Sequence, residues 1–250
     1  MTGGFAQARA AIDGVPGWLS DDQAQRLWDR AAAVPPGGTI VEIGSFRGRS
    51  TIVLALAGPP GATVLAIDPH AGSDRGPQEI AADTARGDAD HAAFTANLRA
   101  AGVQDRVRHL RLASAEALAA VPGEIDLLYV DGAHRYRPAL QDIAGYGGRV
   151  APGGSMLIHD AFSSIGVTLA ILTRLVGAAD FAYAGRSRSL AEYRRAGERL
   201  ATRARLTGAR AQLAQLPWFA RNVAIKFALV ARSPAVAQRL GHRPGDQWPY

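Results

Sequence analysis

Ile40-Val-Glu-Ile-Gly-Ser-Phe-Arg-Gly-Arg-Ser-Thr51 is the stretch that decides the fold of this chain. Its apolar start, Ile40 to Ile43, predicts a short buried strand, and a turn punctuated by Gly44 and Gly48 follows directly. Ser50 and Thr51 then lead into an apolar helical run. A strand, a glycine turn and a helix N-terminus in this order direct backbone N–H groups toward an anionic or polar ligand. Taken alone, the pattern is equally compatible with an ordinary connection between a strand and a helix.

Composition narrows the possible classes of protein. The chain has 250 residues, 48% of them apolar, which is enough for one large core with an appendage. It contains no cysteine, so disulfides, thiolate zinc sites and cysteine nucleophiles are excluded. The N-terminus lacks the pattern of a signal peptide, and apolar runs stay well short of the roughly 20 residues that span a bilayer. We therefore expect a cytoplasmic protein.

Strand and helix patterns alternate along the first three quarters of the chain. Helices are predicted near residues 20–33, 52–57, 91–100, 138–144 and 167–176. Strands are predicted at 40–43, 62–68, 107–112, 125–131 and 155–160, the last after a turn at 152–154, with a hairpin of 181–185 and 189–194. This alternation predicts an α/β fold, a Rossmann-like doubly wound seven-stranded sheet that is mostly parallel, with an antiparallel C-terminal hairpin and helices on both faces. Residues 70–90 show little periodicity and are interpreted as a mobile loop with a helical turn.

The last quarter of the chain has a different charge. From Tyr183 onward it carries 13 basic and 3 acidic residues, whereas the preceding part carries 15 basic and 19 acidic residues. We therefore expect a domain at 1–195, capped by helices within 1–34, and a basic helical extension at 196–250. The extension reads as two helices, 197–216 and 218–240, with four apolar residues on one face of the second: Phe219, Val223, Phe227 and Val230.

Three interpretations of the basic extension remain open. The first is a solvated or dimer-forming helical pair, and we expect a homo-oligomer. The second is a helix at the inner membrane surface, because apolar residues alternate with Arg221 and Lys226. The third is a nucleic-acid contact, which clustered cations would permit. The acidic remainder of the chain and the lack of an RNA-binding motif argue against nucleic acid as a partner.

Acidic residues close three of the predicted strands. Asp68, Asp131 and Asp160 each stand at a strand end, which in a doubly wound sheet is the edge where ligands bind. Asp68 is placed to accept hydrogen bonds from ribose hydroxyls. A dehydrogenase would show Gly-x-Gly-x-x-Gly in its first turn, whereas this chain has Gly44-Ser-Phe-Arg-Gly48 preceded by Glu42.

Four motifs together resemble a known family. They are Glu42-Ile-Gly-Ser-Phe-Arg-Gly-Arg-Ser50, Ile67-Asp68-Pro69, Val130-Asp-Gly-Ala-His134 and Leu157-Ile-His-Asp160. They resemble the class I S-adenosylmethionine (SAM)-dependent methyltransferases, in particular the actinobacterial branch related to macrocin O-methyltransferase and the cephalosporin hydroxylase-like proteins, and more distantly catechol O-methyltransferase. The resemblance covers roughly Val15 to Arg195 and leaves the extension out.

The resemblance implies SAM as cofactor and a set of residues that bind it. Gly44, Phe46 and Ser50 would line the methionine end, Asp68 would hold the ribose, and Ser114 would border the adenine. Asp131 would lie near the sulfonium. The full set implied for the cofactor is Glu42, Gly44, Ser45, Phe46, Ser50, Asp68, Ser114 and Asp131.

A metal site is also implied by the resemblance. Acids at the ends of the fourth and fifth strands hold Mg²⁺ in the metal-dependent members, and Asp131 and Asp160 occupy those positions here. The chain departs from the catechol-type pattern at Ala161, where that group has an amide ligand, so the third ligand stays open. His159 precedes Asp160, and strand alternation predicts that its side chain points away from that carboxylate.

His134 is the predicted general base. The resemblance places a proton-accepting group at this position, and an imidazole with a pKa of about 6.5 is mostly neutral near pH 7. We expect O-methylation of a saccharide or glycosylated metabolite, because the chain is only 7% aromatic and aromatics do not cluster in the 70–90 loop. A small phenolic or catechol-like acceptor and a non-catalytic SAM-binding role are the alternatives. His70 and His91 are interpreted as lid or surface residues.

Overall fold

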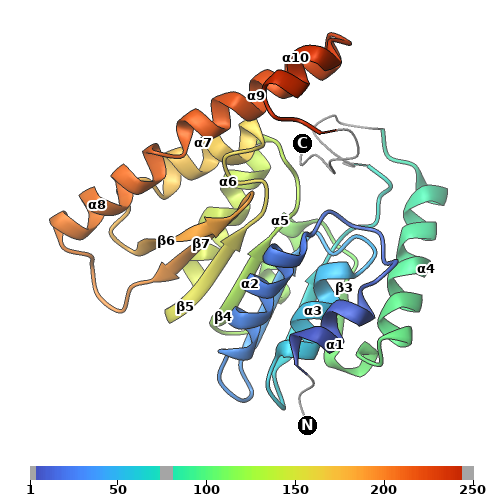
Figure 1. Ribbon diagram of the computed structural model, residues 1–250. Coiled ribbons are helices and arrows are strands. Elements are labelled where there is room, and N and C mark those ends of the chain that lie inside the picture. Colours follow the sequence, from blue (N-terminus) through green and yellow to red (C-terminus); the bar gives the residue numbers. More distant parts are fainter. Residues whose placement is uncertain (1–3, 74–80, 244–250) are drawn as a thin grey trace.

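A seven-stranded sheet with the strand order β3-β2-β1-β4-β5-β7-β6 runs through the middle of the molecule (Figure 1). The computed structural model describes residues 4–73 and 81–243. β1 to β5 are parallel to one another, and β7 pairs antiparallel with both β5 and β6. The strands are β1 (Thr39–Ile43), β2 (Thr63–Ile67), β3 (Val107–Leu110), β4 (Ile125–Val130), β5 (Val150–Ile158), β6 (Phe181–Ser187) and β7 (Leu190–Arg195). The predicted doubly wound sheet with an antiparallel C-terminal hairpin is confirmed.

Helices connect the strands and continue beyond the sheet. The α-helices are α1 (Phe5–Ala11), α2 (Asp21–Ala32), α3 (Arg49–Ala57), α4 (Thr84–Ala100), α5 (Ser114–Ala117), α6 (Tyr136–Gly145), α7 (Ile165–Arg174), α8 (Thr202–Leu213), α9 (Leu216–Val230) and α10 (Pro234–Arg239). Short 3₁₀ turns lie at η1 (Gln104–Arg106), η2 (Leu118–Ala120) and η3 (Gly147–Arg149).

Alternate residues of the central strands enter two separate apolar layers. Val41 and Ile43 pack with α6 and α7 on one face of the sheet, while Ile40 packs with α1, α2, α3 and α4 on the other. On β4, Leu128 lies in the same layer as Val41, and Leu127 lies in the layer of Ile40. Because both faces are covered, the parallel strands read as nearly continuous apolar runs. This is why the sequence predicts them well.

Two predicted boundaries are wrong. The helix expected at 91–100 begins at Thr84, because the Asp83 side chain accepts a hydrogen bond from the Arg86 N–H and caps an earlier start. The turn expected at 152–154 lies inside β5 as a bulge, since the pairing passes from Ile125 with Val150 to Leu127 with Ser155. Residues 74–80 of the expected mobile loop lie outside the described residues.

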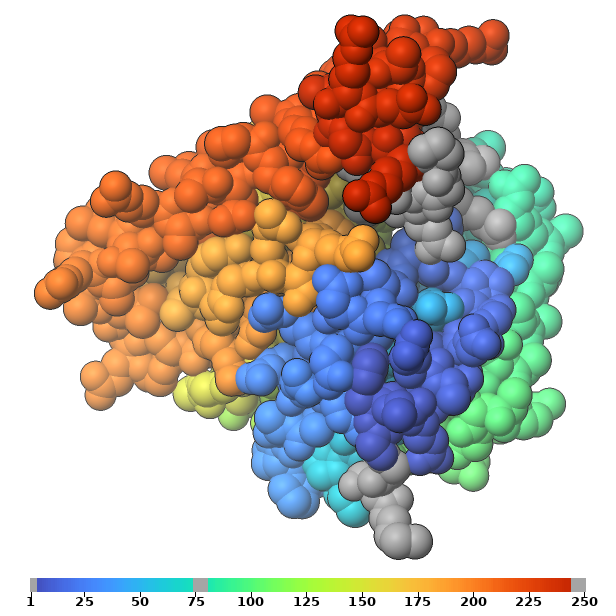
Figure 2. Space-filling view, viewed as in Figure 1, coloured from blue at the N-terminus to red at the C-terminus, as the bar shows by residue number. Residues whose placement is uncertain are grey.

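Within residues 196–243, the basic extension forms three helices where two were predicted. Arg232, with φ of +54°, breaks the second predicted helix between α9 and α10. The three helices form a ridge along one side of the molecule (Figures 1 and 2). Tyr193 donates a hydrogen bond to Gln212, and Asn222 donates one to the Phe162 carbonyl, so α8 and α9 are docked on the sheet domain. On α9, Phe227 is 66% exposed and Val230 is 72% exposed.

The carboxyl ends of the parallel strands meet at one edge of the sheet. There the backbone hydrogen bonds of the sheet continue for one residue beyond the strands. The N–H of Gly44 donates to the Ile67 carbonyl, that of Asp131 to the Ile43 carbonyl, and that of His159 to the Val130 carbonyl. β1 lies between β2 and β4. Starting from β1, the chain places β2 and β3 on one side and then β4 and β5 on the other, so the strand order reverses beside β1. This is the point at which open α/β sheets bind their ligands.

Candidate active site

A cavity of about 380 Å³ opens at this edge of the sheet. Residues from both halves of the parallel sheet line it, so groups far apart in sequence share one space. Among the predicted site residues, those that line the cavity are Gly44, Phe46, Asp68, Ser114, Asp131, His134 and Asp160. Glu42, Ser45 and Ser50 are buried instead and are not among its lining residues.

The glycine turn is fixed by a close backbone contact and by Asp68. Gly44 has a φ of +90°, and a Cβ at this position would lie 2.0 Å from the Asp131 carbonyl oxygen. No residue with a side chain fits this approach of β1 to β4. Phe46, with φ of +45°, donates its backbone N–H to Asp68 Oδ2 over 2.8 Å. The backbone conformation of the turn is therefore fixed by contacts within the protein.

Glu42 supports the turn from behind. The Ser50 hydroxyl donates a hydrogen bond of 2.5 Å to Glu42 Oε1 and the Thr51 hydroxyl donates one of 2.5 Å to Oε2, which ties β1 to the first turn of α3. Complete burial outweighs these hydrogen bonds and raises the pKa of Glu42 to about 7. Ser50 thus contacts Glu42 rather than the cavity.

His70 is buried against the turn rather than exposed in a lid. Only 4% of it is exposed, and its Nε2 lies 2.7 Å from the Phe46 carbonyl oxygen while its backbone N–H donates to Asp68 Oδ1. Its ring packs beside those of His91, Phe94 and His109. The interpretation of His70 as a lid or surface residue is wrong, because α4 begins early and covers it. Gly87 of α4 approaches the His70 carbonyl so closely that a Cβ would lie 1.9 Å away.

The Ser114 end of the cavity is supported by α6 and the residue that follows it. Tyr146 donates a hydrogen bond of 2.6 Å to the Ser114 carbonyl, and Asp142 makes a hydrogen bond to the Ser114 side chain. Burial, the larger influence, raises the pKa of Asp142 to about 6. The sequence did not point to Asp142 or Tyr146, because neither belongs to a recognisable motif.

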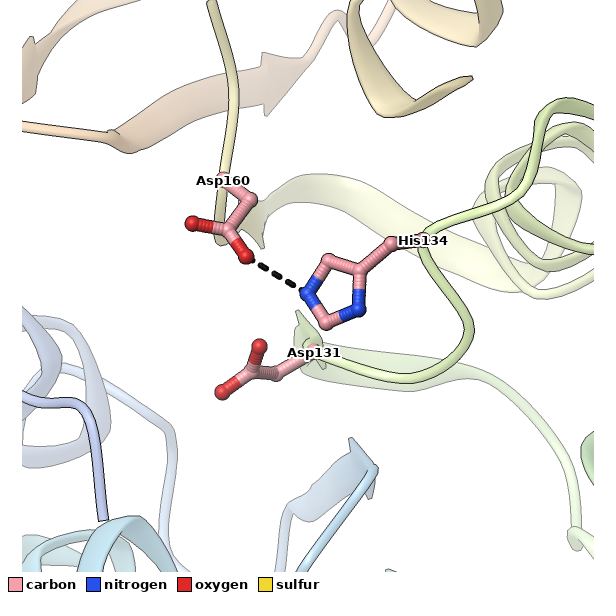
Figure 3. A group of neighbouring side chains, drawn as sticks. All are labelled: Asp131, His134 and Asp160. Carbon is pink, nitrogen blue, oxygen red and sulfur yellow. Dashed lines mark ion pairs between the residues drawn. The ribbon is translucent and has the colours of Figure 1, made fainter. Parts of the chain in front are cut away.

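Asp131, His134 and Asp160 converge at the other end of the cavity (Figure 3). One potential ligand atom of each lies within 4.8 Å of those of the other two. His134 Nε2 lies 2.5 Å from Asp160 Oδ2, and the Tyr129 hydroxyl donates a hydrogen bond of 2.9 Å to Asp131 Oδ2. The predicted alignment of the fourth and fifth strand ends therefore brings these three side chains together.

His159 lies in the same cluster, contrary to the prediction from strand alternation. Its Nδ1 is 3.2 Å from Asp131 Oδ1 and 3.5 Å from Asp160 Oδ1. Alternation fails here because β5 ends at Ile158 and Asp160 has a φ of +55°, which turns its side chain to the same side as that of His159. The sequence held a signal for this residue in its His-Asp pair, but the backbone conformation could not be inferred from it.

The cluster shifts the pKa values of its histidines and of Asp160. Burial alone would lower the pKa of His134, but the Asp160 carboxylate and its hydrogen bond outweigh burial and raise it. Asp131 and Asp160 likewise raise the pKa of His159 well above its ordinary value, against the effect of burial. Burial opposes ionisation of Asp160, but the two imidazoles hold its pKa below the ordinary range. Such coupled shifts are typical of functional sites.

The loop that carries His134 is held by the start of α7. Ser164 Oγ donates a hydrogen bond of 3.3 Å to the His134 carbonyl oxygen. A Cβ on Gly166 would lie 2.2 Å from the same oxygen, so α7 and this loop are in very close contact. The imidazole position is therefore set by backbone packing as well as by Asp160.

Comparison with known proteins assigns this site to a class. Residues 41–161, which include both the glycine turn and the acidic strand ends, match a family described as a methyltransferase domain. The chain contains a class I SAM-dependent methyltransferase domain. SAM is the cofactor of this class, and a cavity of this size at the switch point of the sheet suits a ligand of its dimensions.

Solved structures of other proteins share the fold of this methyltransferase at low sequence identity. The O-methyltransferase TomG from Streptomyces achromogenes, solved with SAM, is 19% identical over 77% of this chain and 88% of its own, with a TM-score of 0.54. The O-methyltransferase NovP is 18% identical over 71% of this chain and 81% of its own, with a TM-score of 0.55. Cofactor-bound Rv0187 from MTB is 19% identical over 77% and 89%, with a TM-score of 0.54.

The described part of this methyltransferase has no membrane-spanning helix. Within residues 4–73 and 81–243, every helix is too short or too polar to cross a bilayer.

Proposed function

We propose that this methyltransferase transfers a methyl group from SAM to a hydroxyl of a saccharide or glycosylated metabolite, with His134 as general base and a divalent cation such as Mg²⁺ on Asp131 and Asp160. The observation that carries the proposal is the position of Asp131, His134 and Asp160 in the same cavity as the glycine turn and Asp68. TomG and NovP, which share the fold, are O-methyltransferases.

The carboxylates suit a cation. Asp131 and Asp160 offer hard oxygen ligands on neighbouring strands, and Asp160 Oδ1 is buried without a hydrogen bond among the described residues. A cation bound here would stabilise the negative charge that develops on the acceptor oxygen. Asp160 also fixes the imidazole of His134, so one residue would serve both the cation and the base.

The proton would pass to His134. Figure 3 shows the Nε2 edge of its ring turned toward Asp160 and Asp131, where an acceptor hydroxyl would lie, whereas Nδ1 is buried. The raised pKa strengthens His134 as a base, because Asp160 stabilises the imidazolium that forms. In the reaction the acceptor oxygen bonds to the methyl carbon and the bond from sulfur to methyl breaks. Sulfur becomes a neutral thioether, and the imidazole of His134, paired with Asp160, takes the hydroxyl proton.

The walls of the cavity support a polar acceptor. Apart from the imidazoles, Trp18 and Phe46 are the aromatic side chains among its lining residues, and their rings pack together with centroids 5.5 Å apart. The lining also includes polar groups such as His134, Arg135 and Gln141. A sugar presents hydroxyls to such groups, whereas a catechol needs a flat apolar slot. Methyl transfer to glycosides should therefore exceed transfer to catechols in an assay with labelled SAM.

The proposal is tested by ligand binding and by a variant of the base. Titration with S-adenosylhomocysteine (SAH), with and without Mg²⁺ or EDTA, should show binding, and its failure at micromolar ligand would exclude SAM-dependent catalysis. We expect His134→Ala to keep SAH affinity and to lose roughly 10²–10⁴ in kcat, the usual contribution of a general base. His91→Ala, which removes an imidazole outside the cavity lining, is the matched control. Unchanged turnover in His134→Ala would refute the role of that residue.

A further inference from the structure

We propose that His159 is a third metal ligand and that its imidazole makes the site select a first-row transition-metal ion, such as Mn²⁺, Fe²⁺, Co²⁺ or Zn²⁺, over Mg²⁺. This inference rests on the proposed function only in taking Asp131 and Asp160 as ligands. It names the donor that the sequence left open at Ala161 and the class of metal that the site takes.

The distances around His159 fit a shared ion. Its Nδ1 lies 3.2 Å from Asp131 Oδ1 and 3.5 Å from Asp160 Oδ1. For metal–ligand bonds of about 2.0–2.2 Å, neighbouring ligand atoms are about 3.0 Å apart in an octahedron and about 3.4 Å apart in a tetrahedron. The two separations are thus close to the edges of a coordination polyhedron. An ion held by either carboxylate oxygen would thus lie within reach of His159 Nδ1.

Two of these atoms are buried and make no hydrogen bond of ordinary geometry. His159 and Asp160 are each 4% exposed, and His159 Nδ1 and Asp160 Oδ1 lack a hydrogen-bond partner among the described residues. Leaving a buried polar group in this state costs about 1–3 kcal/mol, and more when it is charged. Two such atoms that face one another across 3.5 Å indicate a space that a ligand completes.

The arrangement leaves His134 free to act as the base. Asp160 holds His134 through Oδ2 and faces His159 through Oδ1, so the two imidazoles use different oxygens of one carboxylate. The two oxygens of Asp131 also have different partners. Oδ2 accepts a hydrogen bond from the Tyr129 hydroxyl, and Oδ1 faces His159. Tyr129 therefore orients one ligand from outside the cluster, as supporting hydrogen bonds commonly do at metal sites.

The donor set determines the metal. Mg²⁺ takes oxygen ligands almost exclusively and keeps several waters, whereas imidazole nitrogen suits first-row transition metals. Two carboxylate oxygens and one buried imidazole therefore favour a transition-metal ion. If His159 instead served only as a cationic partner of the two aspartates, it would compete with the ion and its removal would improve metal binding. The two possibilities predict opposite effects.

The test compares metals in the intact, metal-stripped protein and in variants of His159. Co²⁺ and Mg²⁺ affinities are measured by titration calorimetry, and pulsed EPR of bound Mn²⁺ detects coupling to an imidazole ¹⁴N. We expect wild-type protein to show the nitrogen coupling. His159→Gln should lose it together with at least roughly tenfold in Co²⁺ affinity, with a much smaller change for Mg²⁺. His159→Asp should shift the preference toward Mg²⁺, because all three donors are then carboxylates.

Controls keep the outcome distinct from that of the proposed function. His91→Ala should leave both affinities and the EPR coupling unchanged, and SAH binding with a native circular-dichroism spectrum should show that each variant folds. Equal Co²⁺ affinity in wild type and His159→Gln, tighter Co²⁺ binding in that variant, or bound Mn²⁺ without nitrogen coupling would overturn the role of His159 while leaving methyl transfer standing. Absence of any metal binding would overturn it as well, whereas failure to bind SAH would contradict the methyltransferase assignment instead.

Discussion

The carboxylates at the two ends of the cavity differ in how the protein satisfies them. At the glycine turn, Glu42 and Asp68 each receive hydrogen bonds on both oxygens from the protein's own hydroxyls or backbone. At the ends of β4 and β5, Asp160 has one oxygen that receives none from the described residues, and it faces an imidazole in the same state. The carboxylates of the first end are satisfied by the protein, and the Asp160 carboxylate of the second end is not.

Because of this difference, the two ends of the cavity suit different ligands. A cofactor that binds by shape and hydrogen bonding needs a rigid cradle, which the satisfied carboxylates provide by fixing Phe46, Ser50 and Thr51. A metal and an acceptor need ligand atoms whose lone pairs are still available, which the Asp131 and Asp160 end provides. Substitutions at the two ends should therefore separate cofactor binding from chemistry.

The largest effect is expected from Asp160→Ala. The variant removes a proposed metal ligand and the partner that orients His134, each worth several kcal/mol in the transition state. We expect kcat to fall roughly 10³-fold or more while SAH affinity stays within a few fold. Steady-state kinetics together with SAH calorimetry measure the two quantities. A parallel loss of SAH affinity would show that the two ends of the cavity are not separate.

Gly44→Ala should damage the rigid end through packing. A Cβ would lie 2.0 Å from the Asp131 carbonyl, and the φ of +90° is strained for alanine. We expect the free energy of unfolding to fall by roughly 3–5 kcal/mol, from overpacking together with backbone strain. Urea unfolding measures this loss, and Gly148→Ala, where a Cβ meets nothing within 4 Å, is the control. Equal stability of the two variants would contradict the close approach of β1 to β4.

Glu42→Gln should remove a pH dependence of stability. Unfolded Glu42 ionises near pH 4.5, whereas the folded carboxyl keeps its proton up to about pH 7, so the folded state binds more protons between these values. Stability from this group is therefore full below pH 4.5 and is lost as pH rises to about 7. We expect wild type to lose roughly 2–3 kcal/mol relative to Glu42→Gln between pH 5 and pH 8. Parallel pH profiles of unfolding free energy would refute the raised pKa.

The smallest effect is expected from His70→Ala. The variant removes the imidazole that lies 2.7 Å from the Phe46 carbonyl oxygen and so loosens the turn. An unmade buried hydrogen bond costs about 1–3 kcal/mol, so we expect SAH to bind roughly tenfold more weakly, with kcat at saturating SAM little changed. Calorimetry and kinetics measure both. A large fall in kcat instead would place His70 in the chemistry rather than in the cradle.

The sequence by itself determined the sheet and most of the residues around its cavity. The strands are buried on both faces and therefore appear as apolar runs, and acids directly after them must meet at one edge of a parallel sheet. These two facts predict the shared location of Asp68, Asp131 and Asp160. The positions of Gly44 and Gly48 follow from the need for left-handed backbone in a tight turn, which both adopt.

Only the tertiary structure decided how individual side chains are used. The φ of +55° at Asp160 brings His159 into the cluster, and a local backbone conformation of this kind cannot be inferred from a pattern of alternation. The early start of α4 buries His70, because packing of Gly87 against the His70 carbonyl depends on contacts distant from both. Hydrophobic periodicity specifies which face of an element is buried. The direction of a polar side chain depends on the partners that the fold brings to it.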